Sequence, residues 1–106
     1  MATSPTQLTL KKLKSEGYVT VQITEVWNSW ARVRQDLFQI IDVLAVKDGV
    51  TTGIQVTSKA NVNARIKKIA DSEHISNLRD AGWKILVHGW FKNKSNRWEC
   101  KIEDVS

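Results

Sequence analysis

The chain has 106 residues, 42% of them hydrophobic, which is enough for one modest core and favours a single domain over residues 1–106. Sixteen Lys and Arg against eleven Asp and Glu give a formal net charge of +5, which favours a polyanionic partner such as nucleic acid. No apolar run is long enough to span a bilayer, and the start MATSPTQLTLKK lacks the apolar centre of a signal peptide. We therefore expect a soluble, cytoplasmic protein with no membrane partner, and the single cysteine, Cys100, excludes an internal disulfide or a cysteine metal cluster.

The first part of the chain predicts a short helix followed by a strand. The helix is expected to begin at Ser4 and Pro5 and to end at Gly17, because proline suits the first helical position and glycine favours a helix end. Residues 18–27 then alternate between apolar and polar side chains, as a strand with one covered face does. Glu25 interrupts the apolar face near the end of this strand and is a candidate site residue.

The next stretch, WNSWARVRQ, has no apolar period and is predicted to be a loop. Arg32 and Arg34 would bring positive charge from this loop to the side of the following strand. We expect Trp27 and Trp30 to pack on the loop as anchors, and base stacking is the alternative role for such rings.

Residues 36–46 are predicted to form a strand that is apolar on both faces and therefore central in its sheet. Asp36 and Asp42 share one of these faces, where a carboxylate is costly unless another group pairs or coordinates it. The two aspartates would lie about 20 Å apart along a strand that rises roughly 3.3 Å per residue, too far for one ion unless a bulge intervenes. Asp36 is therefore expected to be structural and paired with Arg32 or Arg34, whereas Asp42 needs another partner.

A turn at residues 47–49 separates this strand from a second one, predicted for residues 51–57. The second strand carries Gln55 and Thr57 on a polar face. If the two strands form a hairpin, Asp42 and Gln55 meet near one end of the sheet, in a geometry that suits a metal site.

A helical segment is predicted for residues 61–82, with a kink or restart near Asp71, where the apolar spacing changes. Arg65 and Lys68 lie on the side of this helix that can reach toward the sheet edge. Lys67 lies on the opposite flank.

Two further strands are predicted for residues 83–91 and 97–105, the second half open to water as an edge strand would be. His74 and His88 have no metal-ligand spacing to each other or to a carboxylate. The predicted order is helix, three strands, helix and two strands (αβββαββ). It indicates an α/β domain with a mixed central sheet flanked by helices.

This order, with an aspartate in the second strand and a polar pair in the third, resembles the PD-(D/E)xK nuclease superfamily over nearly the whole chain. Within it, IDVLAVKDGVTTGIQVTSK is similar to the catalytic stretch of the small archaeal-type Holliday junction resolvases, whose core is shared by restriction and homing endonucleases. The resemblance implies a restriction-endonuclease-like core. It places Asp42 at the aspartate of the motif, Gln55 at the Asp/Glu position and Thr57 at the lysine position, while Glu25 stands where some members have an additional metal-binding glutamate.

Two positions depart from the family pattern. Gln55 replaces a carboxylate, although an amide oxygen can still ligate a hard cation and glutamine occurs here in some members. Thr57 replaces the lysine that orients water and neutralises phosphate charge. Because this lysine has moved to a neighbouring element in some relatives, Lys68, Lys59 or Arg65 is expected to supply the charge. A catalytically weak or inactive domain is the alternative.

Hydrolysis of a phosphodiester needs an activated water, a clamp on the phosphoryl oxygens and help for the leaving alkoxide, and one or two Mg²⁺ ions supply most of this. Mg²⁺ prefers oxygen ligands, so we expect Asp42, Glu25, the side-chain oxygen of Gln55 and the carbonyl of Val56 to bind Mg²⁺, with Mn²⁺ as a substitute. No small-molecule organic cofactor is expected.

These features together predict a Mg²⁺-dependent DNA endonuclease that acts on branched or structured DNA as a homodimer, since symmetry doubles the site of a small chain. The alternative is a DNA-binding module on a nuclease fold that has lost cleavage. In both cases the contacts to nucleic acid are expected from the basic side chains of the loop, of the turn before the second helix and of that helix, namely Arg32, Arg34, Lys59, Arg65, Lys67 and Lys68.

Overall fold

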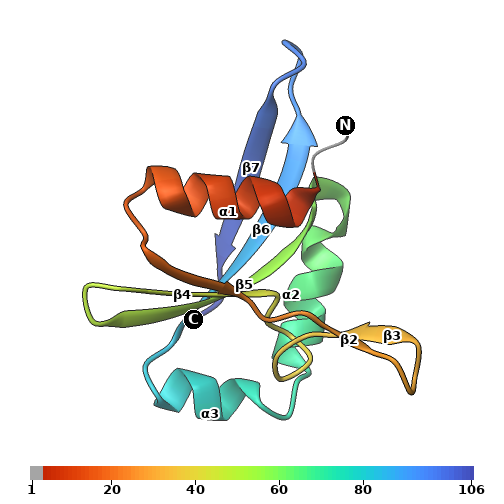
Figure 1. Cartoon of the computed structure of the whole chain (residues 1–106), viewed down its shortest axis with the longest axis vertical. Helices are drawn as coiled ribbons and strands as arrows, with labels where there is room; N and C mark the ends of the chain where they lie inside the picture. The colour runs from red at the N-terminus through yellow and green to blue at the C-terminus, as the bar shows by residue number, and fades with distance from the viewer. Residues whose placement is uncertain (1–3) are drawn as a thin grey trace.

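The computed structural model describes residues 4–106. In chain order its elements are α1 (Pro5–Ser15), β1 (Thr20–Ile23), β2 (Val26–Asn28), β3 (Val33–Gln35), β4 (Val43–Lys47), β5 (Val50–Ser58), the 3₁₀ turn η1 (Lys59–Asn61), α2 (Val62–Ala70), α3 (Ile75–Asp80), β6 (Lys84–Lys92) and β7 (Trp98–Asp104). Five strands form one sheet in the order β1-β4-β5-β6-β7, while β2 and β3 pair only with each other (Figure 1). The protein is therefore mixed α/β, as predicted.

The central hairpin forms as predicted. β4 and β5 pair antiparallel, with Val43 opposite Ile54 at the end far from the turn. Asp48 and Gly49 turn the chain with φ values of 54° and 78°, the conformation that an Asp-Gly pair favours in a two-residue hairpin turn. β5 then pairs in parallel with β6. A parallel pair requires a crossover connection, and α2 and α3 supply it.

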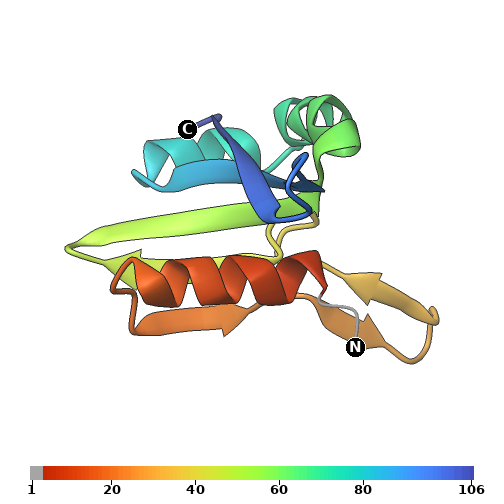
Figure 2. The same ribbon diagram turned by 90° about the horizontal axis from the view of Figure 1, so that it is seen from above.

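Helices cover both faces of the main sheet (Figure 2). α1 packs Leu8 and Leu13 against one face, in a hydrophobic cluster that includes Ile54 of β5. α2 and α3 cover the opposite face in a second cluster that includes Val62. Because side chains alternate along a strand, Gln55 lies on the face covered by α2 and α3. The polar face predicted for this strand is thus inside the molecule.

The prediction of a loop for WNSWARVRQ is wrong, because β2 and β3 form a hairpin there. This hairpin projects from the main sheet (Figures 1 and 2). The described side chains of this hairpin are exposed on both of its faces, so no apolar period marks its strands. The preceding strand, β1, ends at Ile23 and not at Trp27. Trp27 and Trp30 are 59% and 98% exposed, so neither tryptophan is a buried anchor of this hairpin.

The helix predicted for residues 61–82 divides into α2 and α3, with the break at residues 71–74, as expected from the change in apolar spacing. β6 and β7 match the last two predicted strands to within one residue at each end. Within residues 4–106, no helix combines the length and the apolar character that a membrane crossing requires.

Candidate metal centre

Three carboxylates converge at the end of the sheet where β4 begins. Glu25, Asp36 and Asp42 each offer one oxygen, and these three oxygens all lie within 4.8 Å of one another. Asp42 is 5% exposed, and the other two side chains are partly buried. Carboxylates this close repel one another, so the arrangement favours a cation between them.

A tight turn brings Asp36 back to Asp42. Leu37 and Ile41 form both backbone hydrogen bonds of a short antiparallel bridge, at 2.9 and 3.0 Å. Between them, Phe38 and the residue after it have φ values of 53° and 66°, the left-handed pair that a tight hairpin turn requires. The chain therefore reverses where a straight strand was predicted, and the expected separation of about 20 Å between the two aspartates is wrong.

Packing holds this strained turn in place. A non-glycine residue in the left-handed region costs about 1–3 kcal/mol, and such residues persist only where the surroundings impose them. The ring of Phe38 lies 5.6 Å from the ring of His74 and 6.1 Å from that of Trp83, measured between centroids. On the other side, Gly53 leaves room for Ile41, because a Cβ on this glycine would lie 2.5 Å from Cδ1 of the isoleucine.

Thr24 anchors Glu25 beside the turn. The backbone N–H of Thr24 donates to the carbonyl of Asp42 at 2.8 Å, and its hydroxyl donates to the carbonyl of Ile41 at 2.7 Å. Glu25 follows directly and so lies against the start of β4. Its Oε1 is 3.3 Å from Nη1 of Arg34, at the exposed edge of the three carboxylates.

Gln55 reaches the same point from β5. Its Nε2 donates to Oδ2 of Asp42 at 2.5 Å, and the backbone N–H of Val56 donates to the same oxygen at 2.8 Å. The side chain of Gln55 is buried, with the residue 1% exposed, and its Oε1 has no hydrogen-bond partner among the described residues. A buried amide oxygen without a partner costs about 1–3 kcal/mol. Because the N–H and C=O of a strand residue point to the same edge, the carbonyl of Val56 also faces the side where Asp42 lies.

Asp42 is difficult to ionise without a cation. Burial, the hydrogen bond with the carboxyl of Asp36, and the negative charges of Asp36 and Glu25 raise the pKa of Asp42 to about 7, although the N–H of Val56 acts in the opposite direction. A divalent cation would remove this repulsion. The amide nitrogen of Gln55 faces Asp42 in this structure. A 180° turn of the amide would exchange its nitrogen and oxygen, and Gln55 would then offer its oxygen to a cation. The donor set is made of oxygens and fits a hard divalent cation.

Lys68 of α2 supplies positive charge at the centre. Its Nζ lies 3.7 Å from Oδ2 of Asp36. In the described part of the chain Asp36 is therefore paired with Lys68, and not with Arg32 or Arg34 as predicted. Arg34 contacts Glu25 instead. Of Lys59, Arg65 and Lys68, the predicted replacements for a motif lysine, Lys68 is the one that forms an ion pair with a carboxylate of the centre within residues 4–106.

The other predicted residues are distributed around this centre. Thr57 is buried on β5, two residues beyond Gln55 on the same face. Lys59 lies elsewhere, with its Nζ 4.3 Å from the ring centroid of Phe91. Further basic side chains are Arg65, partly buried on α2, Lys67, exposed on α2, and Arg32, exposed in the turn of the β2–β3 hairpin.

Asp36 is the member of the centre that the sequence interpretation missed. Only an irregular backbone joins it to Asp42, and the residues that form the turn, Phe38 and Gln39, are not typical of left-handed positions. A glycine or asparagine there would have been a signal. The strand predicted for residues 36–46 therefore holds only in its second part, where β4 forms.

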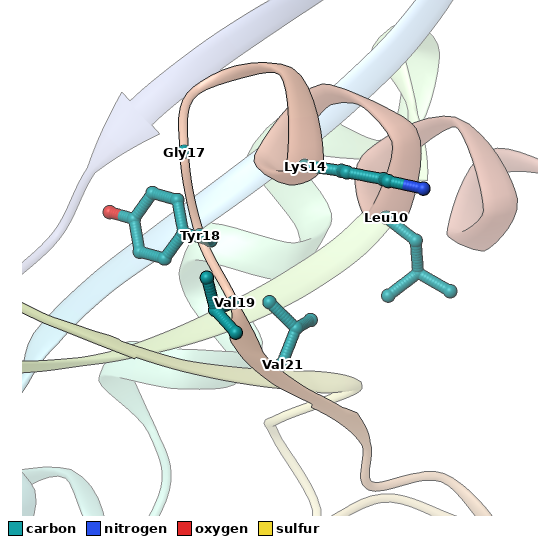
Figure 3. Close-up of a pocket in the computed structure, with 6 residues that line it drawn as sticks. All are labelled: Leu10, Lys14, Gly17, Tyr18, Val19 and Val21. Atoms are coloured by element: carbon teal, nitrogen blue, oxygen red, sulfur yellow. The ribbon is translucent and has the colours of Figure 1, made fainter.

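A separate groove lies where α1 ends and β1 begins (Figure 3). Its lining comes from Leu10, Lys14, Gly17, Tyr18, Val19 and Val21. Apart from one amine and one phenol, these side chains carry no polar group, and no residue of the metal centre lines it. The three carboxylates lie at the other end of β1, beyond Ile23.

Comparisons of this chain with protein-family models, with curated proteins and with solved structures find no match. The resemblance to PD-(D/E)xK nucleases stays a prediction from the sequence.

Proposed function

We propose that this protein is a divalent-metal-dependent nuclease that hydrolyses phosphodiester bonds of DNA on a restriction-endonuclease-like core. One observation carries the proposal: three carboxylate oxygens within 4.8 Å of one another lie beside a buried Gln55 whose amide oxygen is unpaired. Such an all-oxygen set is what Mg²⁺ and Mn²⁺ prefer. The arrangement of β1, β4 and β5 as an antiparallel meander, followed by a helical crossover to parallel β6, supports the proposed core.

Glu25, Asp36, Asp42 and Gln55 would hold the cation. When bound, a divalent cation would polarise the scissile phosphoryl group and make a nearby water a better nucleophile. The chain itself supplies orientation. Val56 fixes one oxygen of Asp42 through its backbone N–H, so the other carboxylate oxygen of this residue is left to face the centre.

Lys68 has the role of an electrostatic clamp. Its ammonium group lies at the edge of the carboxylates, 3.7 Å from Asp36, where a phosphoryl oxygen can approach it. A fixed positive charge beside developing negative charge lowers the barrier more than it strengthens ground-state binding. Lys68 thus supplies the positive charge of the motif lysine, whose position in the sequence is occupied by Thr57.

Basic side chains near the centre supply affinity for the DNA backbone. Arg34 forms an ion pair with Glu25 of the centre, and Arg65 is on the same helix as Lys68. Contacts of this kind add affinity without sequence selectivity and weaken as salt rises. Two such sites in a homodimer would serve to cut two strands.

The test is cleavage of supercoiled plasmid and of linear, flapped and four-way DNA by the pure protein with Mg²⁺, Mn²⁺ or EDTA. We expect nicking only with a divalent cation. Asp42→Asn keeps the shape of the side chain and should reduce the rate by about 100-fold or more, since it removes a charged ligand. Glu99→Gln, which neutralises an exposed carboxylate on β7, is the matched control and should cleave normally. DNA binding with no cleavage in either metal would overturn the proposal and favour a binding module.

A further inference from the structure

A groove of about 410 Å³ opens beside the metal centre, between the start of α1 and the β2–β3 hairpin. Thr6 and Gln7 line it from the helix. Glu25, Trp27 and Arg34 line it from the other side. Glu25 also belongs to the cluster of three carboxylates, so the groove borders that cluster at this residue.

The hairpin presents an aromatic ring and a cation on one face. Trp27 of β2 is paired directly with Arg34 of β3, and residues directly opposite in an antiparallel pair share a face. The tryptophan is 59% exposed and the arginine side chain 74% exposed. Their face is the one that lines the groove.

The metal centre also holds the base of the hairpin. Glu25 directly precedes β2 and Asp36 directly follows β3, so both ends of the hairpin are residues whose carboxylates belong to the centre. The rest of the hairpin projects beyond the main sheet (Figure 2). A strand of nucleic acid lying along this hairpin would therefore have a phosphate close to the carboxylates.

We propose that this groove binds a nucleotide with an unpaired base, stacked on the ring of Trp27, while Arg34 contacts an adjacent phosphate. The proposal deepens the proposed nuclease function and rests on it. It names the substrate class as DNA with unpaired nucleotides beside the cleaved bond, such as flaps, junctions or single strands. A continuous duplex fits less well, because its bases stack on each other and offer no free face to the indole.

Charge favours nucleic acid as the occupant of the groove once a divalent cation offsets the negative charge of Glu25 and its two neighbouring carboxylates. Among the described side chains, the guanidinium of Arg34 contacts Glu25 at 3.3 Å through one nitrogen, and because a guanidinium has five N–H donors, donors remain for a phosphate. The net charge of the chain is +5. An aromatic ring next to an arginine along an exposed path is the usual combination for binding a single strand. A second copy of this chain, equally positive, has less reason to occupy the groove.

The experiment is equilibrium binding of fluorescein-labelled single-stranded, flapped and blunt duplex DNA of equal length, with Ca²⁺ in place of Mg²⁺ and intact substrate verified on a gel. Wild-type protein should bind the two unpaired substrates more tightly than the duplex. Trp27→Ala should weaken binding of these substrates about 5- to 150-fold and should change duplex binding little. Trp27→Phe should restore most of the loss, because a phenyl ring also stacks.

Arg34→Ala should weaken binding and reduce the dependence of log affinity on log salt by about 0.7, the share of one phosphate contact in a single strand. The matched controls are Trp98→Ala and Arg97→Ala at the opposite edge of the sheet, which should bind as wild type. Equal binding by Trp27→Ala, Arg34→Ala and the controls would overturn the proposal. So would a wild-type dimer that Trp27→Ala converts to monomer in sedimentation, because the hairpin would then be a self-association surface.

The two proposals fail in different ways. Selective loss of single-strand binding in Trp27→Ala, in a protein that cleaves nothing with Mg²⁺ or Mn²⁺, would support the groove and overturn the nuclease. Normal metal-dependent cleavage and binding by Trp27→Ala would overturn the groove alone.

Discussion

Two groups of buried polar side chains lie on opposite faces of the same sheet, and only one of them is complete. On the α1 face, the hydroxyl of Thr9 accepts a hydrogen bond from Nε1 of Trp90 at 2.9 Å and lies 3.2 Å from Nδ1 of His88. All three residues are buried. On the α2 face, three carboxylates crowd together and the amide oxygen of Gln55 has no partner in the described chain. In the first group the polar atoms pair with one another and stabilise the fold, whereas in the second the amide oxygen of Gln55 is left unpaired among the described residues, and a proposed cation would relieve the repulsion between the carboxylates.

The two groups also titrate in opposite directions. Burial, followed by the charge of Lys12, lowers the pKa of His88 to about 4, so this ring is neutral at pH 7. Its contribution to stability is complete above its ordinary pKa of 6.5 and is lost as pH falls toward 4. Asp42 has a raised pKa of about 7, so its contribution is complete below its ordinary value of 3.8 and is lost as pH rises toward 7. A cation would reverse the second effect by favouring the ionised carboxylate.

Lys68→Ala should distinguish the two faces of the sheet most clearly, because it should affect cleavage and leave stability nearly unchanged. Removing this charge should lower kcat by about 100- to 1000-fold while affinity for DNA and stability change little, because the contribution of the charge is greatest in the transition state. Single-turnover cleavage and DNA titration at several salt concentrations measure the two quantities. Lys67→Ala, exposed on the same helix, is the control for kcat, which should stay unchanged. An equal loss of binding at every salt concentration would make Lys68 a plain phosphate contact.

Asp42→Asn should stabilise the metal-free protein while reducing the cleavage rate by about 100-fold or more. Asparagine keeps an acceptor for Val56 but carries no charge, so the free energy of unfolding at pH 8 should rise by roughly 2–4 kcal/mol. Urea unfolding in EDTA at pH 5 and pH 8 measures this. The variant should retain a stability that increases from pH 4 to pH 6.5, which is the contribution of His88. Destabilisation at pH 8 would show that the carboxylate is not under repulsion.

Thr9→Val should have the opposite effects to Asp42→Asn: the stability of the protein should fall and cleavage should stay normal. Valine leaves the ring nitrogens of His88 and Trp90 without their common partner, which should cost about 2–3 kcal/mol. Thermal unfolding and cleavage at a temperature where the variant is folded separate the two effects. Thr20→Val, at an exposed position of β1, is the matched control. Loss of cleavage in folded Thr9→Val would mean that the α1 face has a role in the chemistry.

The smallest effect is expected from Gln55→Glu. A fourth carboxylate should tighten binding of Mg²⁺ or Mn²⁺ by about 10-fold, because ligand charge increases affinity for hard cations. Isothermal titration calorimetry measures this. Thr51→Glu, partly buried on the same strand and near its other end, serves as a charge control. An unchanged dissociation constant would remove Gln55 from the ligands.

Regular local structure was predictable because helices and strands with one buried face repeat their apolar residues at a regular spacing in the sequence. Alternation along β4 and β5, with an Asp-Gly turn between them, is enough to place Asp42 next to Gln55. The change of spacing near Asp71 is enough to divide α2 from α3. The β2–β3 hairpin was not predictable in this way, because a hairpin exposed on both faces has no period to detect.

By itself, then, the sequence determined the mixed α/β class, the central hairpin, and Asp42 with Gln55 as a polar pair inside the sheet. Only the tertiary structure decided that Asp36 joins the centre and that Lys68 reaches it. The physical reason is that the turn at Phe38 opposes the local preference of its residues. Contacts with His74 and Trp83, far along the chain, compensate for that strain, and contacts at such separation leave no local pattern in a single sequence.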